Sequence, residues 1–287
     1  MIVVTGATGQ LGRQVVHHLL AQGVPAAQII AVDRDSADAN ELSTLGVEVR
    51  FADYDLPETL APAFAGADKV LLVSSPAGTD ATRVKQHQAV IGAALESGVQ
   101  LLAYTSVTHA PTNTMGLAPV HRATEQAIAA SGLPAVILRN GWYAENHTAA
   151  LRGAVTYGAL TGSAGNGRMA AVSRADLAEA AAVVLTREDQ AGKTYDLTGD
   201  TTWTLSDLAA EAAAQSGTTL TYTDLPAEQY RQVLQQAGLP EHIVELIVDA
   251  DVAIAGGTLD HVTSDLSTLL GRPTTPMSAI VAQALRA

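Results

Sequence analysis

The first twelve residues carry the feature that most constrains the fold, because a β-branched run leads there into three evenly spaced glycines. The run covers residues 2–4, the glycines are Gly6, Gly9 and Gly12, and an apolar segment with helical spacing follows at once. This order predicts a strand, a tight turn and a helix. Gly6 permits the turn, Gly9 allows a ligand to approach the backbone, and Gly12 lets the helix pack closely on the strand.

The N–H groups at the start of that helix have no partner within the helix and would face the pyrophosphate of a dinucleotide. The sequence therefore predicts a dinucleotide-binding turn, and the alternative is a plain structural turn between strand and helix. The predicted cofactor contacts in this turn are Gly6, Thr8, Gly9, Gln10, Leu11 and Gly12.

Strand-like and helix-like segments alternate along the first half of the chain. Strands are expected at 2–4, 28–33, 47–51, 69–74, 99–105 and 134–139, and helices at 10–20, 39–45, 57–65, 81–97 and 118–130. Continuous apolar strands separated by helices are typical of a parallel sheet covered on both faces. The expected fold class is therefore α/β, a Rossmann-type doubly wound parallel sheet.

The regular alternation ends after Arg139. Residues 153–167 are rich in glycine and are expected to be irregular, short strands are expected at 169–172, 193–197 and 219–222, and helices at 174–185, 205–215, 227–236, 241–252 and 277–285. We expect an NAD(P)-binding Rossmann domain over residues 1–140 and a smaller α+β substrate-binding lobe over 141–287. This division allows the chain to cross back to the sheet.

Composition excludes several classes of function. The chain has 16 basic and 29 acidic residues, a formal net charge of −13 and no cluster of Lys or Arg, so nucleic acid and anionic membranes are not expected as partners. The absence of cysteine excludes disulfides and thiolate chemistry. No apolar run approaches the length of a membrane span, and the first strand leaves no room for a signal peptide. We expect a cytoplasmic protein, and an oligomer remains open.

Two charged residues at the end of the second expected strand bear on the choice of cofactor. Asp33 lies where an acidic side chain would bind the adenosine ribose of NAD, whereas Arg34 would pair with the 2′-phosphate of NADP. Because Asp33 would repel that phosphate, these two residues alone slightly favour NAD; the alternative is an exposed turn. Asp53 could accept a hydrogen bond from the adenine amino group or could serve as a turn or cap residue.

Several stretches together carry a resemblance to a known family. They are Thr-Gly-Ala-Thr-Gly-Gln-Leu-Gly at 5–12, Tyr-Thr-Ser at 104–106, Arg-Asn-Gly-Trp-Tyr-Ala-Glu-Asn at 139–146, Gly-Asp-Thr-Thr-Trp-Thr-Leu at 199–205 and Leu-Gly-Arg-Pro-Thr-Thr at 270–275. The chain resembles, essentially from end to end, the NmrA-like branch of the atypical short-chain dehydrogenases, and within it the bacterial type 2 NAD(P)H:quinone oxidoreductases.

The resemblance implies a reductase without flavin or metal that passes a hydride from a nicotinamide cofactor, usually NADPH, to a small quinone. One position departs from the family pattern. Where the family has an apolar residue followed by the arginine that reads the phosphate, this chain has Asp33 before Arg34. The departure leaves NADH open as the cofactor.

The Tyr and Lys pair of conventional short-chain dehydrogenases is missing. His121 and Glu125 occupy these two positions on the expected helix over 118–130. A glutamate cannot lower the pKa of a phenol as a lysine does, so the usual route to ketones and alcohols is disfavoured. A quinone depends less on an acid to donate a proton, because addition of the hydride creates a resonance-stabilised phenolate. The spacing of four residues predicts a surface or pocket-wall pair, since two ligands are too few for a metal site.

The remaining candidates follow the fourth, fifth and sixth strands, because open α/β sheets bind ligands at the carboxyl ends of their strands. The aromatic pair among them could instead be core, and the histidine could be a solvated or capping group. The candidates for the cofactor are Ser74, Ser75, Thr105, Asn140 and Gly141. Those for the substrate are Ser106, Trp142, Tyr143 and Asn146, and those for catalysis are His109 and Tyr143.

Two other classes of function remain open from the sequence. A non-catalytic redox sensor of the NmrA type would bind NAD(P) without consuming it, and the loss of the Tyr and Lys pair would permit this role. A reductase or epimerase acting on a sugar nucleotide or a phenolic compound ranks below it, because sugar epimerases need that pair. Turnover of the cofactor discriminates the sensor from the enzyme.

Overall fold

The computed structural model describes residues 1–34, 40–76 and 78–286, and the chain forms two compact units. Unit 1 comprises Met1–Ala110, Pro119–Asn140 and Arg174–Asp196, and unit 2 comprises Pro111–Ala118, Gly141–Ser173 and Leu197–Ala287. Residues 174–196 therefore belong to the same unit as the N-terminal segment, although they follow the expected boundary at residue 140.

Unit 1 is organised around a seven-stranded sheet. Its strands are β1 (Ile2–Thr5), β2 (Ile29–Asp33), β3 (Glu48–Phe51), β4 (Lys69–Leu72), β5 (Leu101–Val107), β6 (Ala135–Asn140) and β8 (Thr194–Leu197). Their order is β3-β2-β1-β4-β5-β6-β8, and β1 to β6 pair in parallel. The order of β1 to β6 is that of a doubly wound dinucleotide-binding fold, so the predicted fold class is confirmed.

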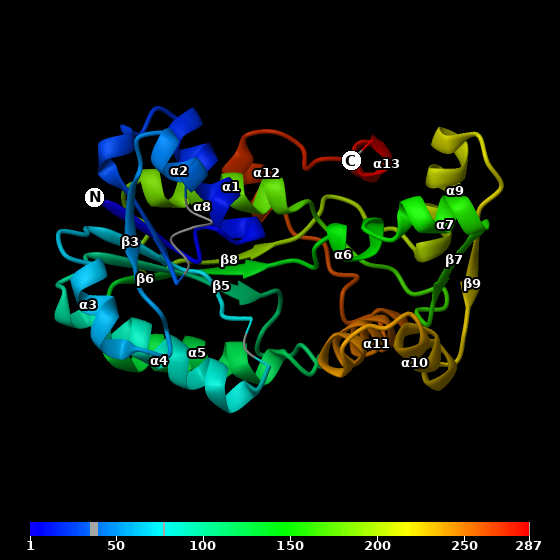
Figure 1. Cartoon of the computed structure of the whole chain (residues 1–287), viewed down its shortest axis with the longest axis horizontal. Coiled ribbons are helices and arrows are strands. Elements are labelled where there is room, and N and C mark those ends of the chain that lie inside the picture. Colours follow the sequence, from blue (N-terminus) through cyan, green and yellow to red (C-terminus); the bar gives the residue numbers. More distant parts are fainter. Residues whose placement is uncertain (35–39, 77, 287) are drawn as a thin grey trace. The chain divides into compact units, whose positions relative to one another are not determined.

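Helices cover both faces of this sheet. They are α1 (Gln10–Ala21), α2 (Asn40–Thr44), α3 (Leu60–Ala63), α4 (Asp80–Glu96), α5 (Ala118–Ser131) and α8 (Arg174–Thr186), and single 3₁₀ turns precede β2 (Ala26–Gln28) and α3 (Pro57–Thr59). Figure 1 shows α1 and α8 on one face of the sheet and α3, α4 and α5 on the other. The helix expected from residue 39 begins at Asn40 here, and Ala39 lies outside the described residues.

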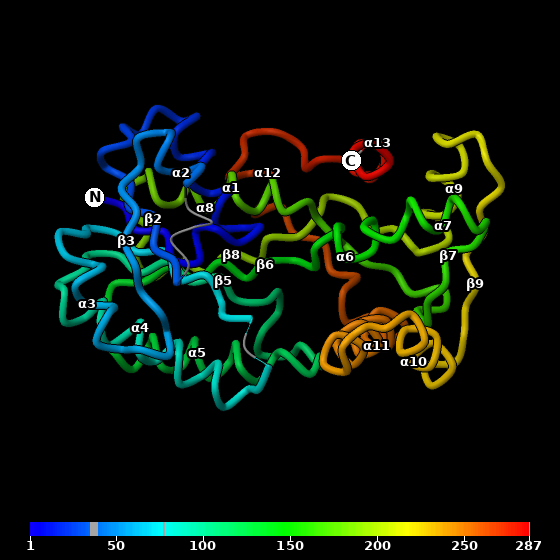
Figure 2. The backbone as a smooth tube through the Cα atoms, in the orientation of Figure 1, coloured from blue at the N-terminus to red at the C-terminus, as the bar shows by residue number. Residues whose placement is uncertain are grey.

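Burial explains why the strands read as continuous apolar runs. Every residue of β5 is buried, because this strand lies inside the sheet between β4 and β6 with helices above and below. Tyr104 is fully buried there, and Phe64 of the segment after α3 belongs to the same core. After the first part of unit 2 the chain returns to the sheet, and β8 lies beside β6 (Figure 2).

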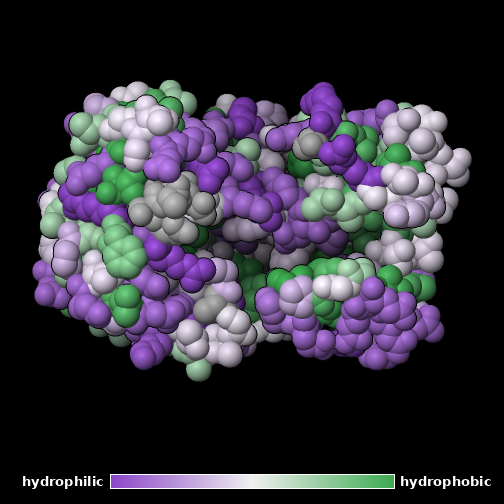
Figure 3. All heavy atoms as spheres, viewed as in Figure 1, coloured by the Kyte–Doolittle hydropathy of each residue, from purple (hydrophilic) through white to green (hydrophobic). Residues whose placement is uncertain are grey.

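Unit 2 is built mainly from helices around two short parallel strands. Its elements are α6 (Glu145–Thr148), α7 (Leu151–Tyr157), β7 (Ala159–Gly162), α9 (Leu205–Ser216), β9 (Thr221–Asp224), α10 (Ala227–Gln236), α11 (Glu241–Ala255), α12 (Asp265–Leu270) and α13 (Met277–Arg286). The strands β7 and β9 pair with each other. No residue of α10 is buried, and hydrophilic side chains cover this helix on the face shown in Figure 3.

Two expectations for this region are wrong. Residues 153–167 are not irregular throughout, because α7 and β7 occupy most of 151–162; Leu151, Ala154 and Leu160 enter the core of unit 2, and Gly158 ends α7 with a φ of 76°. Residues 169–172 do not form a strand. Met169 and Val172 make isolated bridges to different partners, Trp203 and Tyr143, so no ladder develops. The short helices α6 and α12 were not expected.

A buried carboxyl group lies in unit 2. Asp251 on α11 is 1 % exposed, and its Oδ2 accepts a hydrogen bond from the backbone N–H of Ser163 at 2.7 Å. Burial raises the pKa of Asp251 to about 6, and the nearby negative charge of Asp224 contributes to this rise. The neighbouring titratable groups are the phenols of Tyr222 and Tyr230.

Within the described part of the chain, no helix combines the length and the hydropathy that a membrane span requires.

Candidate active site

The glycine turn has the backbone geometry that the sequence predicts. Gly6 has a φ of +57°, and Gly9 precedes α1 in an extended conformation without a side chain to cap the helix. A Cβ added at Gly12 would lie 2.3 Å from the carbonyl oxygen of Gly6, so only glycine fits there. The first turn of α1 contains no acidic residue. Its N–H groups are therefore available to an anion from outside the helix.

Asp33 is bound to this turn. Its Oδ2 accepts hydrogen bonds from the backbone N–H of Thr8 at 3.1 Å and from the Thr8 hydroxyl at 2.7 Å. Arg34 is exposed. Asp53 accepts a hydrogen bond on Oδ1 from the N–H of Asp55 at 2.9 Å, which is the pattern of an Asx turn. Asp33 thus shapes the backbone of the glycine turn, and Asp53 shapes the turn that follows β3.

The predicted cofactor residues after β4 and β5 are joined to one another. The Ser74 N–H donates to the Thr105 hydroxyl at 2.9 Å, which ties the ends of the two strands together. Thr105 and Ser75 are buried, and the Ser75 hydroxyl donates to Gln86. Ser74 is only partly buried.

A buried polar network that sequence reasoning missed lies next to Ser74. Arg83 of α4 donates from Nη2 to the Ser74 Oγ at 3.0 Å, and His87, one turn further along α4, lies 3.4 Å from the same oxygen. The Ser75 N–H donates to His87 Nε2 at 2.9 Å, which assigns the His87 proton to Nδ1. Burial lowers the pKa of His87 to about 4, so the ring is neutral at pH 7.

The network continues through Tyr104 to His121. The Tyr104 hydroxyl lies 2.8 Å from His121 Nδ1, and the His87 and Tyr104 rings meet edge to face with centroids 5.5 Å apart. Burial lowers the pKa of His121 to about 3 and raises that of Tyr104 to about 12. The i, i+4 spacing of Arg83 and His87 is visible in the sequence, but their partners come from other elements.

His121 and Glu125 do not form the predicted surface or pocket-wall pair. Glu125 instead makes a bidentate ion pair with Arg139 of β6, with N···O distances of 3.0 and 2.8 Å. Ser106 is buried and donates its hydroxyl to Glu125 at 2.6 Å. These contacts place Ser106 in a structural network, which argues against the predicted contact with substrate.

The same network reaches His109 at the end of β5. Nη1 of Arg139 also lies 3.6 Å from Oδ2 of Asp196 on β8. The other carboxylate oxygen of Asp196, Oδ1, accepts a hydrogen bond from the backbone N–H of His109 at 2.6 Å. His109 has a φ of 50°, which is uncommon for a residue with a side chain. This bond holds the His109 backbone in place.

The candidates around 140–146 divide between the two units. Asn140 ends β6 in unit 1, is buried, and accepts the N–H of Thr108 with its carbonyl oxygen. In unit 2, Gly141 donates its N–H to the Leu197 carbonyl, and a Cβ added there would lie 2.7 Å from that oxygen. Close backbone packing therefore explains this glycine. Tyr143 bridges to Val172, and Asn146 lies on α6.

Trp142 belongs to an aromatic group in unit 2. Its Nε1 donates to His147 Nε2 at 3.0 Å, and the His147 ring meets Trp203 edge to face with centroids 6.2 Å apart. Burial lowers the pKa of His147 to about 4. Trp142 packs against the core of unit 2. This contact supports the alternative to substrate binding, namely that Trp142 is a core residue.

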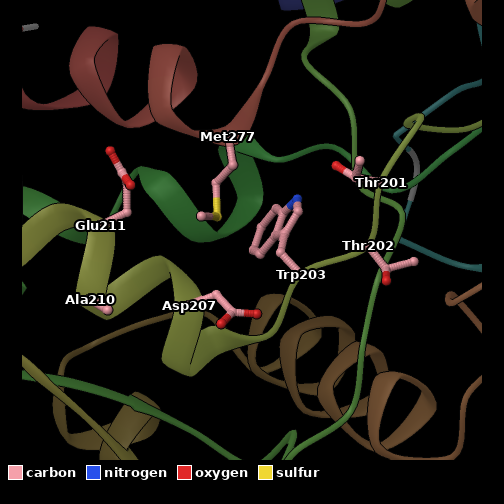
Figure 4. A pocket seen from close by; sticks show the side chains of 7 residues that line it. All are labelled: Thr201, Thr202, Trp203, Asp207, Ala210, Glu211 and Met277. Atoms are coloured by element: carbon pink, nitrogen blue, oxygen red, sulfur yellow. The ribbon is translucent and has the colours of Figure 1, made fainter.

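A pocket of about 450 Å³ in unit 2 shares Trp203 with this aromatic group (Figure 4). Trp203 and Met277 provide its apolar wall, and the carboxyl groups of Asp207 and Glu211 lie on α9 beside them. The other residues that line it are Thr201, Thr202 and Ala210. None of the residues predicted for cofactor or substrate lines this pocket. Among the described residues, no group of three or more His, Cys, Asp or Glu side chains is arranged to hold a metal ion.

The chain matches a known family along most of its length. The model of the NmrA-like family matches residues 1–264. Quinone oxidoreductase 2 of Escherichia coli is 43% identical over 281 residues, which cover 98% of this chain and 97% of that protein.

Two solved structures are similar along their whole length. The NADPH-dependent quinone oxidoreductase of E. coli in complex with NADPH has a TM-score of 0.94 and 43% identity, with 99% of each chain covered. Triphenylmethane reductase of Citrobacter sp. in complex with NADP(H) has a TM-score of 0.96 and 40% identity, covering 99% of this chain and 100% of that chain.

Proposed function

The chain belongs to the NmrA-like family, and from this premise we propose that it is a reductase that passes a hydride from NAD(P)H to a quinone. One observation carries the proposal. The chain is 43% identical, over nearly its whole length, to a quinone oxidoreductase whose NADPH complex has the same fold.

The glycine turn fits a dinucleotide. Gly9 and Gly12 place no side chain at the start of α1, no side chain caps the helix there, and its first turn carries no acidic residue. The N–H groups of residues 10–12 and the positive end of the helix dipole would hold that group. When bound, the nicotinamide supplies the hydride for the reaction. The Ser74 hydroxyl at the end of β4 is the next group proposed to meet the cofactor.

Asp33 weighs less in favour of NADH than its position in the sequence indicates. Its carboxylate accepts two hydrogen bonds from Thr8, and this role in the turn requires no ribose. Arg34 is exposed beside it and can pair with a 2′-phosphate. Together with the NADPH complex of the relative, these contacts favour NADPH, and both cofactors belong in the first assay.

The missing Tyr and Lys pair fits a quinone as the acceptor. His121 is neutral and bonded to Tyr104, and Glu125 is held by Arg139, so neither can replace the missing acid. A quinone takes up the negative charge in an aromatic phenolate. What this chain must supply is therefore the orientation of the two rings and exclusion of water.

The test is the loss of absorbance at the reduced-nicotinamide band with purified flavin-free protein, a simple benzoquinone, and NADH or NADPH in parallel. Saturable turnover above the uncatalysed rate is the expected result. A triphenylmethane dye is the second acceptor to include, because a relative of 40% identity reduces such dyes. Tight binding of the cofactor without turnover of either acceptor would favour the redox sensor.

A further inference from the structure

Arg83 carries a positive charge and forms no ion pair with a carboxylate in the described part of unit 1, although the charge of Asp80 on the same helix acts on it. Among the described residues, its side chain donates one hydrogen bond, from Nη2 to the neutral Ser74 hydroxyl at 3.0 Å, and its buried Nε meets no acceptor there. A guanidinium has five N–H donors. Among the described residues, no carboxylate forms an ion pair with Arg83, although acidic residues outnumber basic ones by 29 to 16.

The side chains that share the hydrogen-bond network with Arg83 are neutral, and the negative charge that acts on its pKa comes from Asp80 at the start of the same helix. His87 accepts the Ser75 N–H on Nε2 and donates from Nδ1 to the Thr124 hydroxyl, so it carries a single proton. The charge of Arg83 adds to burial in lowering the pKa of His87. Tyr104 is a neutral phenol. These groups hold Arg83 in place without compensating its charge.

A partly buried charge without a counterion destabilises a fold unless a bound ligand of opposite charge pairs with it. Burial lowers the pKa of Arg83, which is the sign of this cost. The Ser74 contact also fixes one end of the guanidinium at the carboxyl end of β4, where open α/β sheets bind ligands. The donors of Arg83 that remain unused suit a planar or tetrahedral oxyanion.

We propose that Arg83 binds an oxyanion that a ligand brings to this edge of the sheet. Two ligands carry that chemistry: a phosphate of the cofactor, and the phenolate oxygen of the reduced quinone. In the second case the hydride brings two electrons and a proton to the quinone, the nicotinamide is oxidised, and one carbonyl oxygen takes the negative charge. A proton from solvent then completes the hydroquinone. This second case rests on the proposed function.

The test compares Arg83→Gln, Arg83→Lys and the control Arg152→Gln. Arg152 is an exposed arginine of α7, so the control removes the same charge away from the network. Three quantities are measured: the Kd of NADPH and of NADH without quinone, kcat and KM for benzoquinone, and the midpoint of unfolding.

If Arg83 binds a phosphate of the cofactor, Arg83→Gln should raise the Kd of the cofactor at least tenfold. The rise should be seen for NADPH alone if Arg83 binds the 2′-phosphate, and for both NADPH and NADH if it binds the diphosphate. A phenolate predicts unchanged Kd values and a kcat lowered at least tenfold. In both cases Arg83→Lys keeps a positive charge, so its Kd or kcat should lie between the values of the wild type and of Arg83→Gln. The unfolding midpoint of Arg83→Gln should equal or exceed that of the wild type.

Two results would overturn the proposal. In the first, Arg83→Gln keeps both Kd values and kcat within twofold of the wild type and of Arg152→Gln. In the second, its unfolding midpoint falls and all activities decline in parallel, which would make Arg83 a structural residue. If the wild type itself does not reduce quinone, the proposed function fails, and the Kd values alone decide the role of Arg83.

Discussion

Replacing Gly12 by alanine tests the glycine turn where the backbone leaves the least room. The added Cβ would lie 2.3 Å from the Gly6 carbonyl oxygen and 3.0 Å from the Ala7 Cα, whereas ordinary contact begins at 3.4 Å. Both obstacles are backbone atoms and cannot rotate aside. The first turn of α1 must therefore move away from the backbone of Gly6 and Ala7 by roughly 1 Å, and such a shift is the kind of strain that overpacking causes.

Two magnitudes follow from this displacement. Overpacking lowers the free energy of unfolding by about 1–3 kcal/mol. Each hydrogen bond from a helix N–H to a charged phosphate contributes about 1.5–3 kcal/mol. Losing one such bond raises the Kd of the cofactor about 10- to 150-fold. We expect both effects in Gly12→Ala.

The assay is equilibrium titration of the variant with NADPH and NADH, together with denaturant unfolding. Gly92→Ala is the matched control, because Gly92 lies in the middle of α4 and its added Cβ would meet nothing within 4 Å. That change should stabilise the fold by about 0.5–1 kcal/mol and leave the Kd unchanged. If Gly12→Ala binds both cofactors within twofold of the wild type, the start of α1 does not hold the pyrophosphate.

Three further changes have expected outcomes. Asp33→Asn keeps an acceptor for Thr8 but removes the charge that would repel a 2′-phosphate, so the ratio of Kd values should shift about tenfold toward NADPH in parallel titrations. Asp251→Asn should raise the free energy of unfolding by about 3 kcal/mol at pH 8 and by almost nothing at pH 4, measured by denaturant unfolding, because the pKa of Asp251 is raised from 3.8 to about 6. Glu125→Gln leaves the half-buried Arg139 without its bidentate partner and should lower the free energy of unfolding by about 2–3 kcal/mol in the same assay.

The sign of the Asp251 effect follows from linkage. The folded state holds this proton more tightly than the unfolded state, so the neutral form stabilises the protein below pH 4. This stabilisation is lost as the pH rises from about 4 through about 6. Asp260→Asn, which removes a carboxyl group from a half-exposed side chain, is the control. A constant difference in the free energy of unfolding between Asp251→Asn and the wild type across this range would contradict the argument.

The other two predictions can be contradicted as well. Equal changes in the Kd of both cofactors would contradict the one for Asp33→Asn. A change in the free energy of unfolding below about 0.5 kcal/mol would contradict the one for Glu125→Gln.

The glycine turn and the sheet could be predicted because their signals are local. The periods of two and 3.6 residues and the positions of Gly6, Gly9 and Gly12 depend only on nearby residues. In unit 2 local patterns predicted α9, α10, α11 and α13 but failed over residues 151–162. There α7 and β7 form in a stretch that contains several glycines, because Leu151 and Leu160 are buried in a core that distant segments complete.

What the sequence alone determined is the doubly wound fold, the dinucleotide turn and the absence of the Tyr and Lys pair. Only the tertiary structure decided which partners the polar residues take: Asp33 with Thr8, Glu125 with Arg139, His121 with Tyr104, and Arg83 with no acidic partner among the described residues. The reason is physical. Backbone conformation and periodicity are set within a few residues, whereas the pairing and desolvation of a charge depend on which strands and helices the sheet brings together.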